Sequence, residues 1–360
     1  MMNGKKCLLI SPVAENNFGG GIGLNKSRIL LTELFRDNLY CVDFRMGVLS
    51  NVQKLRWTLQ GYTVGLTRSV KTEALAVMAR EAPDYVFINS SNYGLLAKAI
   101  KKRYPGCKIV TFFHNVEIKY SYDVVRRLKK IGNVLSFFAF AYNEWMAIRY
   151  SDTIIALSER DSALLHKIYK RSADFLVPVT FDDKLDYNKL TERREQKPRG
   201  IFAGSLFFPN EYGVRWFVQH VAPHVNAEIL IIGKGFEMLK NDLECDNVKV
   251  IGTVEDVSEY FYRADFVIAP IFEGSGMKLK TAEALMYGKT IFGTTEAFSG
   301  YALDFDRVGG LCNTAREFID KINGYPYPQR RFNEESRKIY EQNYSMEHSR
   351  HLFRMIFEKI

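Results

Sequence analysis

The segment 270–289 has the residue pattern with the clearest chemistry in this sequence. A short apolar strand is expected to end at Pro270, and the turn Gly274-Ser275-Gly276 precedes a helix expected over 277–287. Glycine lets the backbone approach a ligand closely. The unpaired amides of a first helical turn, together with the helix dipole, favour an anion. The pattern therefore predicts a diphosphate site at this turn and at Met277, where the helix starts.

Two charged residues of the same expected helix are candidate ligand contacts. Lys280 and Glu283 are three residues apart and share one helix face, while apolar residues occupy the other face. A carboxylate can accept from the two hydroxyls of a ribose, and an ammonium suits a neighbouring diphosphate. The alternative is a solvated Lys/Glu pair worth a few tenths of a kcal/mol, and the spacing alone leaves both interpretations open.

His114 lies at the end of another expected strand, 108–113. Open α/β sheets bind ligands beyond the carboxyl ends of their strands, so this histidine is a candidate site residue. A lone histidine is more often structural, and its position alone does not decide between the two roles.

The sequence has no recognisable metal, disulfide or dinucleotide motif. Its six histidines and its carboxylates form no HExxH, paired-aspartate or Asp-x-Asp pattern. The five cysteines are scattered and odd in number, which is typical of buried thiols in a reducing compartment. The glycines of 19–23 fail the G-x-G-x-x-G spacing because Leu24 occupies the third position. We expect no catalytic metal and no cofactor.

Short apolar stretches rich in Val, Ile and Phe alternate with helical patterns along the whole chain, which is typical of βα units that feed parallel sheets. In the first half, strands are expected at 6–11, 39–44, 85–89, 108–113, 153–157 and 174–177, with a glycine-rich turn at 18–23 and a helix through 27–35. In the second half, strands are expected at 200–203, 227–232, 248–251, 266–270 and 290–293, with helices at 211–220 and 277–287. Both halves are predicted to be doubly wound, Rossmann-like α/β domains.

The length of 360 residues, with 47% hydrophobic residues, is enough for two cores. A polar, charge-dense stretch interrupts the βα pattern near the middle of the chain. The predicted organisation is an N-terminal domain at 1–180, a linker at 181–198, a C-terminal domain at 199–338 and a C-terminal helix at 339–360 that packs back towards the N-terminal domain.

Charge is distributed unevenly between the halves. Residues 1–180 contain 26 Lys and Arg against 14 Asp and Glu, whereas residues 181–360 contain 24 against 27. This suggests an anionic partner for the first half, either nucleic acid, an anionic membrane surface or a phosphorylated acceptor. RNP, KH and helix-turn-helix signatures are missing, so nucleic acid is not expected. No apolar run approaches the roughly 18 residues of a membrane span, and a cytoplasmic protein is expected.

Several segments resemble the retaining family-4 glycosyltransferases, which have the GT-B fold. The Gly-Ser-Gly turn and Glu283 resemble the stretch in which that family binds the diphosphate and the ribose of its donor. Further similar segments follow in the order that the family requires, namely 202–210, 231–235, 250–256 and, upstream, 151–161. The resemblance covers most of the chain.

One departure from the family pattern concerns the donor sugar. Many members have a Glu-x7-Glu pair, but Ser275 stands eight residues before Glu283, and Glu273 is two places out of register. The resemblance then leaves the sugar contacts to backbone amides of the turn. The Gly-Ser-Gly and Lys-x-x-Glu form also resembles a recognised branch of the family.

A second departure concerns the diphosphate. An Arg and a Lys often follow the position of Gly204, whereas Ser205 occupies the first of these places here. We therefore expect Lys280 to offset the diphosphate charge, with Lys278 or Lys234 in support.

The resemblance implies a metal-independent hexosyltransferase whose two Rossmann-like domains face each other across a cleft. His114 would face the donor sugar and act with Lys280 in catalysis, while the loop of Gly19, Gly20 and Gly21 would bring the acceptor close. The implied donor-binding residues are Gly204, Ser205, Gly233, Lys234, Val254, Gly274, Ser275, Gly276, Met277, Lys280 and Glu283.

The implied reaction moves a sugar from a nucleotide-sugar donor to a glycan or lipid-linked acceptor with retention of anomeric configuration. The departing diphosphate would accept the proton, and the setting would be bacterial capsule, O-antigen or exopolysaccharide synthesis. Two alternatives stay open, a sugar-nucleotide epimerase of the same fold and a non-catalytic nucleotide-sugar-binding subunit of a glycan assembly complex.

Two segments of the basic half suggest peripheral attachment to the inner face of the plasma membrane. A basic run at 126–130 precedes an apolar run at 134–140, and 54–57 adds a basic stretch that contains a tryptophan. Such a combination suits an interfacial helix on anionic lipid. The alternative is a buried helix with a solvated basic end.

Overall fold

The computed structural model describes residues 2, 4–13, 20–45, 51–63, 66–128, 131–193, 197–274 and 276–360. The chain divides into two compact units. Unit 1 comprises Met1–Pro178 and Ser349–Ile360, and unit 2 comprises Val179–His348. In this division, residues 181–198 lie in unit 2 and the chain from Ser349 lies in unit 1.

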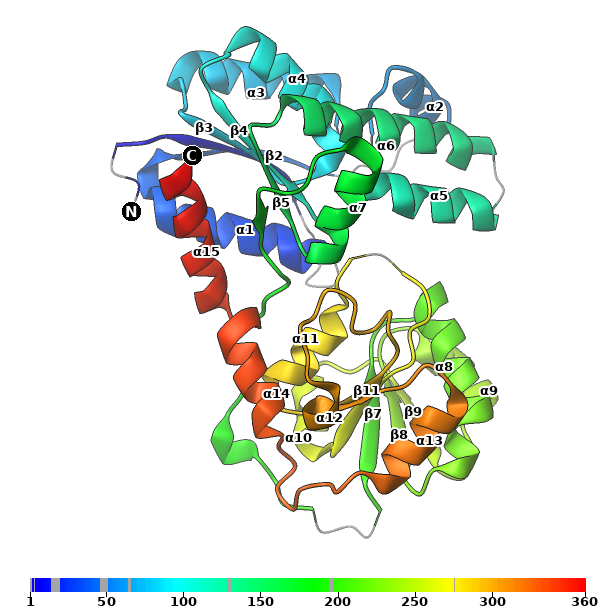
Figure 1. Cartoon of the computed structure of the whole chain (residues 1–360). Helices are drawn as coiled ribbons and strands as arrows, with labels where there is room; N and C mark the ends of the chain where they lie inside the picture. The colour runs from blue at the N-terminus through cyan, green and yellow to red at the C-terminus, as the bar shows by residue number, and fades with distance from the viewer. Residues whose placement is uncertain are drawn as a thin grey trace. The chain divides into compact units, whose positions relative to one another are not determined.

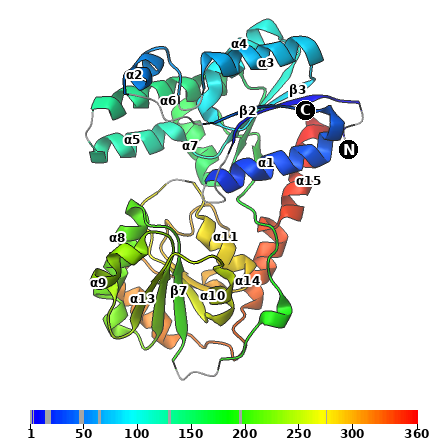
Figure 2. The same cartoon turned by 180° about the vertical axis from the view of Figure 1, so that it is seen from behind.

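Unit 1 is built on a parallel sheet with the strand order β2-β1-β3-β4-β5-β6 (Figure 1). The strands of β1, β3 and β5 are buried along their whole length, as expected for a parallel sheet with helices on both faces. Helices α3 and α4 lie on one face, and α1 and α15 lie on the other (Figures 1 and 2). The strands are β1 (Cys7–Pro12), β2 (Leu39–Phe44), β3 (Tyr85–Ile88), β4 (Lys108–Phe113), β5 (Thr153–Ala156) and β6 (Phe175–Leu176). The helices are α1 (Gly20–Phe35), α2 (Asn51–Leu59), α3 (Arg68–Glu81), α4 (Gly94–Arg103), α5 (Glu117–Leu128), α6 (Ile131–Tyr150) and α7 (Glu159–Tyr169).

The C-terminal helix α15 (Met346–Lys359) completes the core of unit 1. The Phe357 ring packs edge-on against Phe35 and Tyr85, with centroid distances of 5.0 and 5.3 Å. The Arg350 guanidinium forms an ion pair of 2.8 Å with Glu33 of α1. The end of the chain is therefore part of the same core as the first strand.

Unit 2 is built on a second parallel sheet with the order β12-β11-β10-β7-β8-β9. Phe217 of α8 and Phe318 of α13 pack edge-on at 5.6 Å over its buried aliphatic residues. The strands are β7 (Arg199–Ala203), β8 (Glu228–Ile232), β9 (Val248–Gly252), β10 (Phe266–Ala269), β11 (Thr290–Gly293) and β12 (Gly309–Leu311). The helices are α8 (Phe208–His220), α9 (Lys240–Leu243), α10 (Ser258–Arg263), α11 (Leu279–Met286), α12 (Phe305–Val308), α13 (Ala315–Gly324) and α14 (Glu334–Ile339).

The predicted architecture of two doubly wound α/β halves is confirmed, and the strands expected from the sequence lie within two residues of those observed. One expected turn differs. Residues 20–23 form the first turn of α1, so the helix begins inside the glycine-rich segment and not after it. Strand β12 was not predicted, since its two glycines give it little of the β-branched pattern of the other strands. Within the described residues, no helix has the length and apolar character needed to cross a bilayer.

Candidate functional site

Each sheet has one place where the direction of winding reverses. In unit 1 this is between β1 and β3, and in unit 2 it is between β7 and β10. Open α/β sheets bind ligands beyond the carboxyl ends of the strands at this point.

The ammonium of Lys280 lies beside the end of β7 in unit 2. Its Nζ donates to Oδ1 of Asn210 at 2.6 Å and lies 4.2 Å from the ring centroid of Phe202. Asn210 in turn donates from Nδ2 to the carbonyl of Ser205 at 2.7 Å. A Cβ added at Gly204 would lie 3.0 Å from Asn210 Nδ2 and 3.3 Å from Lys280 Nζ. Gly204 has no side chain, and the Lys280 ammonium therefore lies directly beside its backbone.

Burial sets the ionisation of Lys280 and Glu283, which are neighbours on α11. Burial, with a smaller effect of the Lys278 charge, lowers the pKa of Lys280 to about 7. Burial raises the pKa of Glu283 to about 7, against the opposing charges of Lys184 and Lys280. No residue in the described ranges donates a hydrogen bond to the Glu283 carboxylate. This half-buried carboxylate is open to a ligand that brings hydroxyl donors.

The glycine loop before α11 is held by a different lysine. Lys278 Nζ donates to the carbonyl of Gly276 at 2.9 Å and forms an ion pair of 2.7 Å with Glu296. Gly274 has φ +150° and packs closely against Lys278, so a side chain there would be strained. Ser275 lies outside the described residues. Lys278 thus holds the glycine loop in place. Lys280 is the lysine of this segment whose ammonium lies beside the end of β7.

The start of α11 leaves backbone donors available. The helix has Lys278 at its N-cap position and no side-chain cap, and Met277 just before it is buried. In the first turn the amide of Thr281 donates to the Lys278 carbonyl at 3.0 Å, while the amides before it have no partner within the helix. These donors and the Lys280 ammonium lie on the same eight-residue helix as Glu283.

Gly233 brings the loop after β8 against the loop after β7. Its φ is +146°, and a Cβ there would lie 2.0 Å from the carbonyl oxygen of Gly204. Only glycine fits this contact. Lys234 is exposed, and its carbonyl accepts from the amide of Leu206 at 2.8 Å. The predicted residues Gly204, Gly233 and Lys234 are therefore neighbours.

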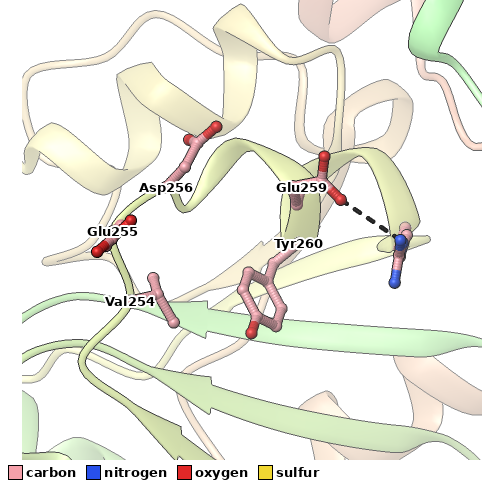
Figure 3. Close-up of a pocket in the computed structure, with 6 residues that line it drawn as sticks. Val254, Glu255, Asp256, Glu259 and Tyr260 are labelled. Atoms are coloured by element: carbon pink, nitrogen blue, oxygen red, sulfur yellow. Dashed lines mark hydrogen bonds and ion pairs between the residues drawn. The ribbon is translucent and has the colours of Figure 1, made fainter.

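Val254 lines a hollow of about 300 Å³ at the loop between β9 and α10. Its side chain and the Tyr260 ring point to the same side, while the Asp256 and Glu259 carboxylates point away from them (Figure 3). Asp256 accepts from the amide and hydroxyl of Ser258 at 2.8 and 2.6 Å, and these hydrogen bonds lower the pKa of that carboxyl. An apolar side chain beside a phenol ring suits the face of a flat ligand. The full lining is Val254, Glu255, Asp256, Glu259, Tyr260 and Arg263.

In unit 1, His114 belongs to a hydrogen-bonded network at the ends of β1, β3 and β4. Its Nε2 lies 3.0 Å from Oδ1 of the fully buried Asn89. Asn89 donates from Nδ2 to Ser11 Oγ and to the carbonyl of Leu24, each at 3.1 Å. The Nδ1 edge of the imidazole faces the first turn of α1, where a Cβ at Gly23 would lie 3.1 Å from Nδ1.

Burial determines the ionisation of His114, and the hydrogen bond to Asn89 determines its tautomer. Burial first, and the nearby charge of Lys26 second, lower the pKa of His114 to about 3. The imidazole is therefore neutral near pH 7. Because Asn89 Nδ2 donates to the Leu24 carbonyl, its Oδ1 is the acceptor for His114, and the ring proton is on Nε2. Nδ1 is then an acceptor.

A buried cation lies next to this histidine. Lys26 is 4% exposed and donates from Nζ to the carbonyl of Pro178 at 2.8 Å. Burial lowers its pKa to about 7. Of the expected acceptor-side loop, Gly20 and Gly21 begin α1, and Gly19 lies outside the described residues.

Three residues of these sites did not follow from the motifs, namely Asn89, Asn210 and Lys26. Asn89 and Asn210 form hydrogen bonds with candidate residues in distant parts of the chain, and the charge of Lys26 acts on His114. The signal available for Asn89 was its place at the end of an expected strand.

Among the described residues, no three His, Cys, Asp or Glu side chains gather as a metal site.

A comparison with known families finds a match within unit 2. Residues 197–324 match the family described as glycosyl transferases group 1. No protein of curated function matches the sequence.

Solved structures of similar fold cover nearly the whole chain. Sucrose-phosphate synthase from Thermosynechococcus elongatus is 14% identical with a TM-score of 0.72, over 99% of this chain and 100% of the other. HepE of Anabaena in complex with UDP is 13% identical with a TM-score of 0.69, again over 99% and 100%. The lipopolysaccharide outer core galactosyltransferase WaaB is 14% identical with a TM-score of 0.64, over 98% and 100%. The chain therefore has the two-domain α/β fold of the GT-B glycosyltransferases.

Proposed function

We propose that this protein is a glycosyltransferase whose unit 2 binds a nucleoside diphosphate sugar. The observation that carries the proposal is the arrangement on α11, where an ammonium beside the bare Gly204 backbone and an unpartnered carboxylate lie one helical turn apart. The match of residues 197–324 to glycosyl transferases group 1 supports it, and so does the presence of UDP in a structure of the same fold.

Each part of the donor has a matching group in unit 2. The diphosphate lies against the first turn of α11 and the Lys280 ammonium, whose charge the phosphates stabilise. The Glu283 carboxylate accepts from the ribose hydroxyls. The base lies against the loop that contains Val254.

The reaction is transfer with retention to a glycan or lipid-linked acceptor. The acceptor oxygen forms the new bond to the anomeric carbon as the bond to the diphosphate breaks, and the diphosphate takes the acceptor proton. Lys280 and the helix amides offset the charge that develops on the leaving group, without a requirement for a metal ion. His114 acts on the donor sugar as a neutral hydrogen-bond acceptor through Nδ1, since its pKa of about 3 leaves no proton to donate there. Bacterial surface polysaccharide assembly is the pathway class proposed.

A thermal-shift screen with UDP, GDP, ADP, CMP and dTDP tests donor binding. A ligand selective for the folded state at one hundred times its Kd stabilises that state by about 2.7 kcal/mol. One nucleoside diphosphate is expected to raise the melting temperature of the wild type, and Glu283→Ala is expected to lose most of the shift. If none of the five nucleotides shifts the melting temperature, the donor site assigned to unit 2 is wrong.

A further inference from the structure

Helix α6 carries a stripe of exposed apolar side chains. Val134, Phe138, Tyr142 and Trp145 follow one another at intervals of four, four and three residues and are 39%, 62%, 38% and 44% exposed. This spacing places them on one helix face, and we call them the α6 stripe. A surface helix of a globular protein normally presents polar residues on this face. The stripe therefore requires a partner or a function.

The opposite face of α6 accounts for its packing in unit 1. Ala139, Met146 and Ala147 are buried, and α4 packs so closely that Gly94 has no room for a side chain against the α6 backbone. The helix contains two charged residues, Glu144 and Arg149. Glu144 is fully buried and accepts from Tyr169 Oη at 2.7 Å. The core thus explains one face of α6 and leaves the stripe unexplained.

The helices next to α6 also carry exposed apolar side chains. Figures 1 and 2 show α2 and α5 alongside α6, and both pack against it. Leu55 and Leu59 of α2, one helical turn apart, are 47% and 71% exposed. Tyr120 and Tyr122 of α5 are 49% and 53% exposed.

A cation lies beside each of two of these aromatic rings. Lys98 Nζ lies 5.9 Å from the Tyr142 ring centroid, and the Arg149 guanidinium carbon lies 5.8 Å from that of Trp145. Between Gly94 and Tyr150 the sequence has eleven Lys and Arg against three Asp and Glu. Aromatic and aliphatic side chains bordered by cations are what a peripheral helix presents to a bilayer with anionic head groups.

We propose that the α6 stripe docks unit 1 on an anionic lipid surface, with the helix lying in the interface. From Val134 to Trp145 the stripe is about 17 Å long at 1.5 Å per residue, long enough to lie along the head groups. The four apolar side chains enter the interface, while Arg149 and Lys98 contact lipid phosphates. Docking itself is independent of catalysis. Its role, which is to present the enzyme to a lipid-linked acceptor, rests on the proposed function.

Vesicle flotation tests the apolar part of the surface. The probes are vesicles of phosphatidylcholine alone and of phosphatidylcholine with 30% phosphatidylglycerol. The double variant Phe138→Ser and Trp145→Ser keeps helix propensity nearly unchanged, because both wild-type residues rank close to serine. It is expected to bind anionic vesicles at least tenfold more weakly, since each aromatic ring removed from the interface is worth roughly a factor of ten. Met238→Ser, at a residue of unit 2 that is 73% exposed, is the matched control and should float like the wild type.

The charged part is tested with Arg149→Gln, which is expected to weaken flotation about fivefold, since one cation at an anionic surface is worth roughly 1 kcal/mol. Arg316→Gln in unit 2, whose side chain is 91% exposed, is the matched control. Binding should fall as added salt shortens the Debye length. Equal flotation with both vesicle types, or wild-type binding by the double variant, would overturn the proposal. A wild-type dimer that the double variant converts to monomer would assign the stripe to a second copy of the chain instead.

Donor turnover measured without vesicles separates this proposal from the enzymatic one. The stripe variants are expected to turn over a nucleotide sugar like the wild type. Absence of turnover in every protein, together with intact anionic flotation, counts against the proposed function and leaves the docking surface standing.

Discussion

The affinity of unit 2 for a nucleoside diphosphate should be greatest near pH 7, because two ionisations with opposite requirements meet there. Burial raises the pKa of Glu283 to about 7 and lowers that of Lys280 to about 7. The ribose needs the ionised carboxylate, so affinity falls as the pH drops through 7. The diphosphate needs the charged ammonium, so affinity falls again as the pH rises through 7.

The size of the fall in affinity on each side of pH 7 follows from these pKa values. One pH unit beyond a pKa leaves about a tenth of the group in the competent form, which lowers affinity by up to about tenfold. Glu283→Gln removes the fall in affinity below pH 7 that depends on protonation of this carboxylate. It also replaces hydrogen bonds to a charged acceptor with neutral ones, which costs about 1 to 2 kcal/mol at pH 8. At pH 6 the wild-type carboxyl is mostly protonated, so wild type and variant should differ little. Lys280→Arg should keep its affinity to higher pH than the wild type does, because a guanidinium stays charged.

Isothermal titration with UDP between pH 5.5 and 8.5 measures these profiles, with circular dichroism as the check that each protein is folded. A phosphate group titrates near pH 6 itself, but equally for both proteins, so the ratio of the two affinities isolates Glu283. Parallel profiles for wild type and Glu283→Gln would refute the ribose contact.

Three further predictions concern catalysis and folding. His114→Ala should lower donor turnover at least tenfold while UDP affinity stays within twofold, because its contact matters more in the transition state than in the ground state; unchanged turnover would make the residue structural. Gly233→Ala should lower the free energy of unfolding by more than about 2 kcal/mol in a denaturant titration, since its Cβ would lie 2.0 Å from the Gly204 carbonyl and its φ is +146°. Burial raises the pKa of Glu144 to about 7, so its contribution to stability is full below pH 4.5 and is lost as the pH rises through 7. The wild-type melting temperature should then fall relative to that of Glu144→Gln between pH 5 and 7.5, and a constant difference would contradict this.

Most strands could be predicted from the sequence, and most readily those that are apolar on both faces, such as β1, β3 and β5. Each buried strand of a parallel sheet is a short Val, Ile and Phe run, which a reader of the sequence can recognise without knowing its neighbours. The region of Lys280 and Glu283 could be predicted for a similar reason. Its turn, helix start and charged pair lie within ten residues of one another.

The remaining site contacts join distant parts of the chain. Lys280 binds Asn210 across 70 residues, and His114 binds Asn89 across 25. No local pattern marks such partners, because an asparagine at a strand end is equally compatible with a solvated turn. The ionisation of Lys280 likewise depends on burial, which the tertiary structure determines.

The exposed face of α6 likewise could not be identified from the sequence. The apolar run at 134–140 was compatible with a buried helix and with an interfacial one. An almost uncharged helix gives no sign of which face packs inward. In the structure one face of the helix is buried and the other is exposed, since Ala139 is buried and Phe138 is 62% exposed.

The proposed glycosyltransferase cleaves the bond between a sugar and a nucleoside diphosphate, and proton NMR of a nucleotide-sugar panel incubated with the protein detects this cleavage. Slow transfer to water needs no other acceptor, and spectra taken before mutarotation report the anomer released. The expected result is release of nucleoside diphosphate and of the free sugar in the configuration of the donor, with loss of both signals in Glu283→Ala at a limiting donor concentration. A free sugar of inverted configuration would contradict retention, and an epimerised nucleotide sugar would identify an epimerase. If every sugar nucleotide in the panel stays intact, even with lipid-linked and glycan acceptors added, the protein is not the glycosyltransferase described above.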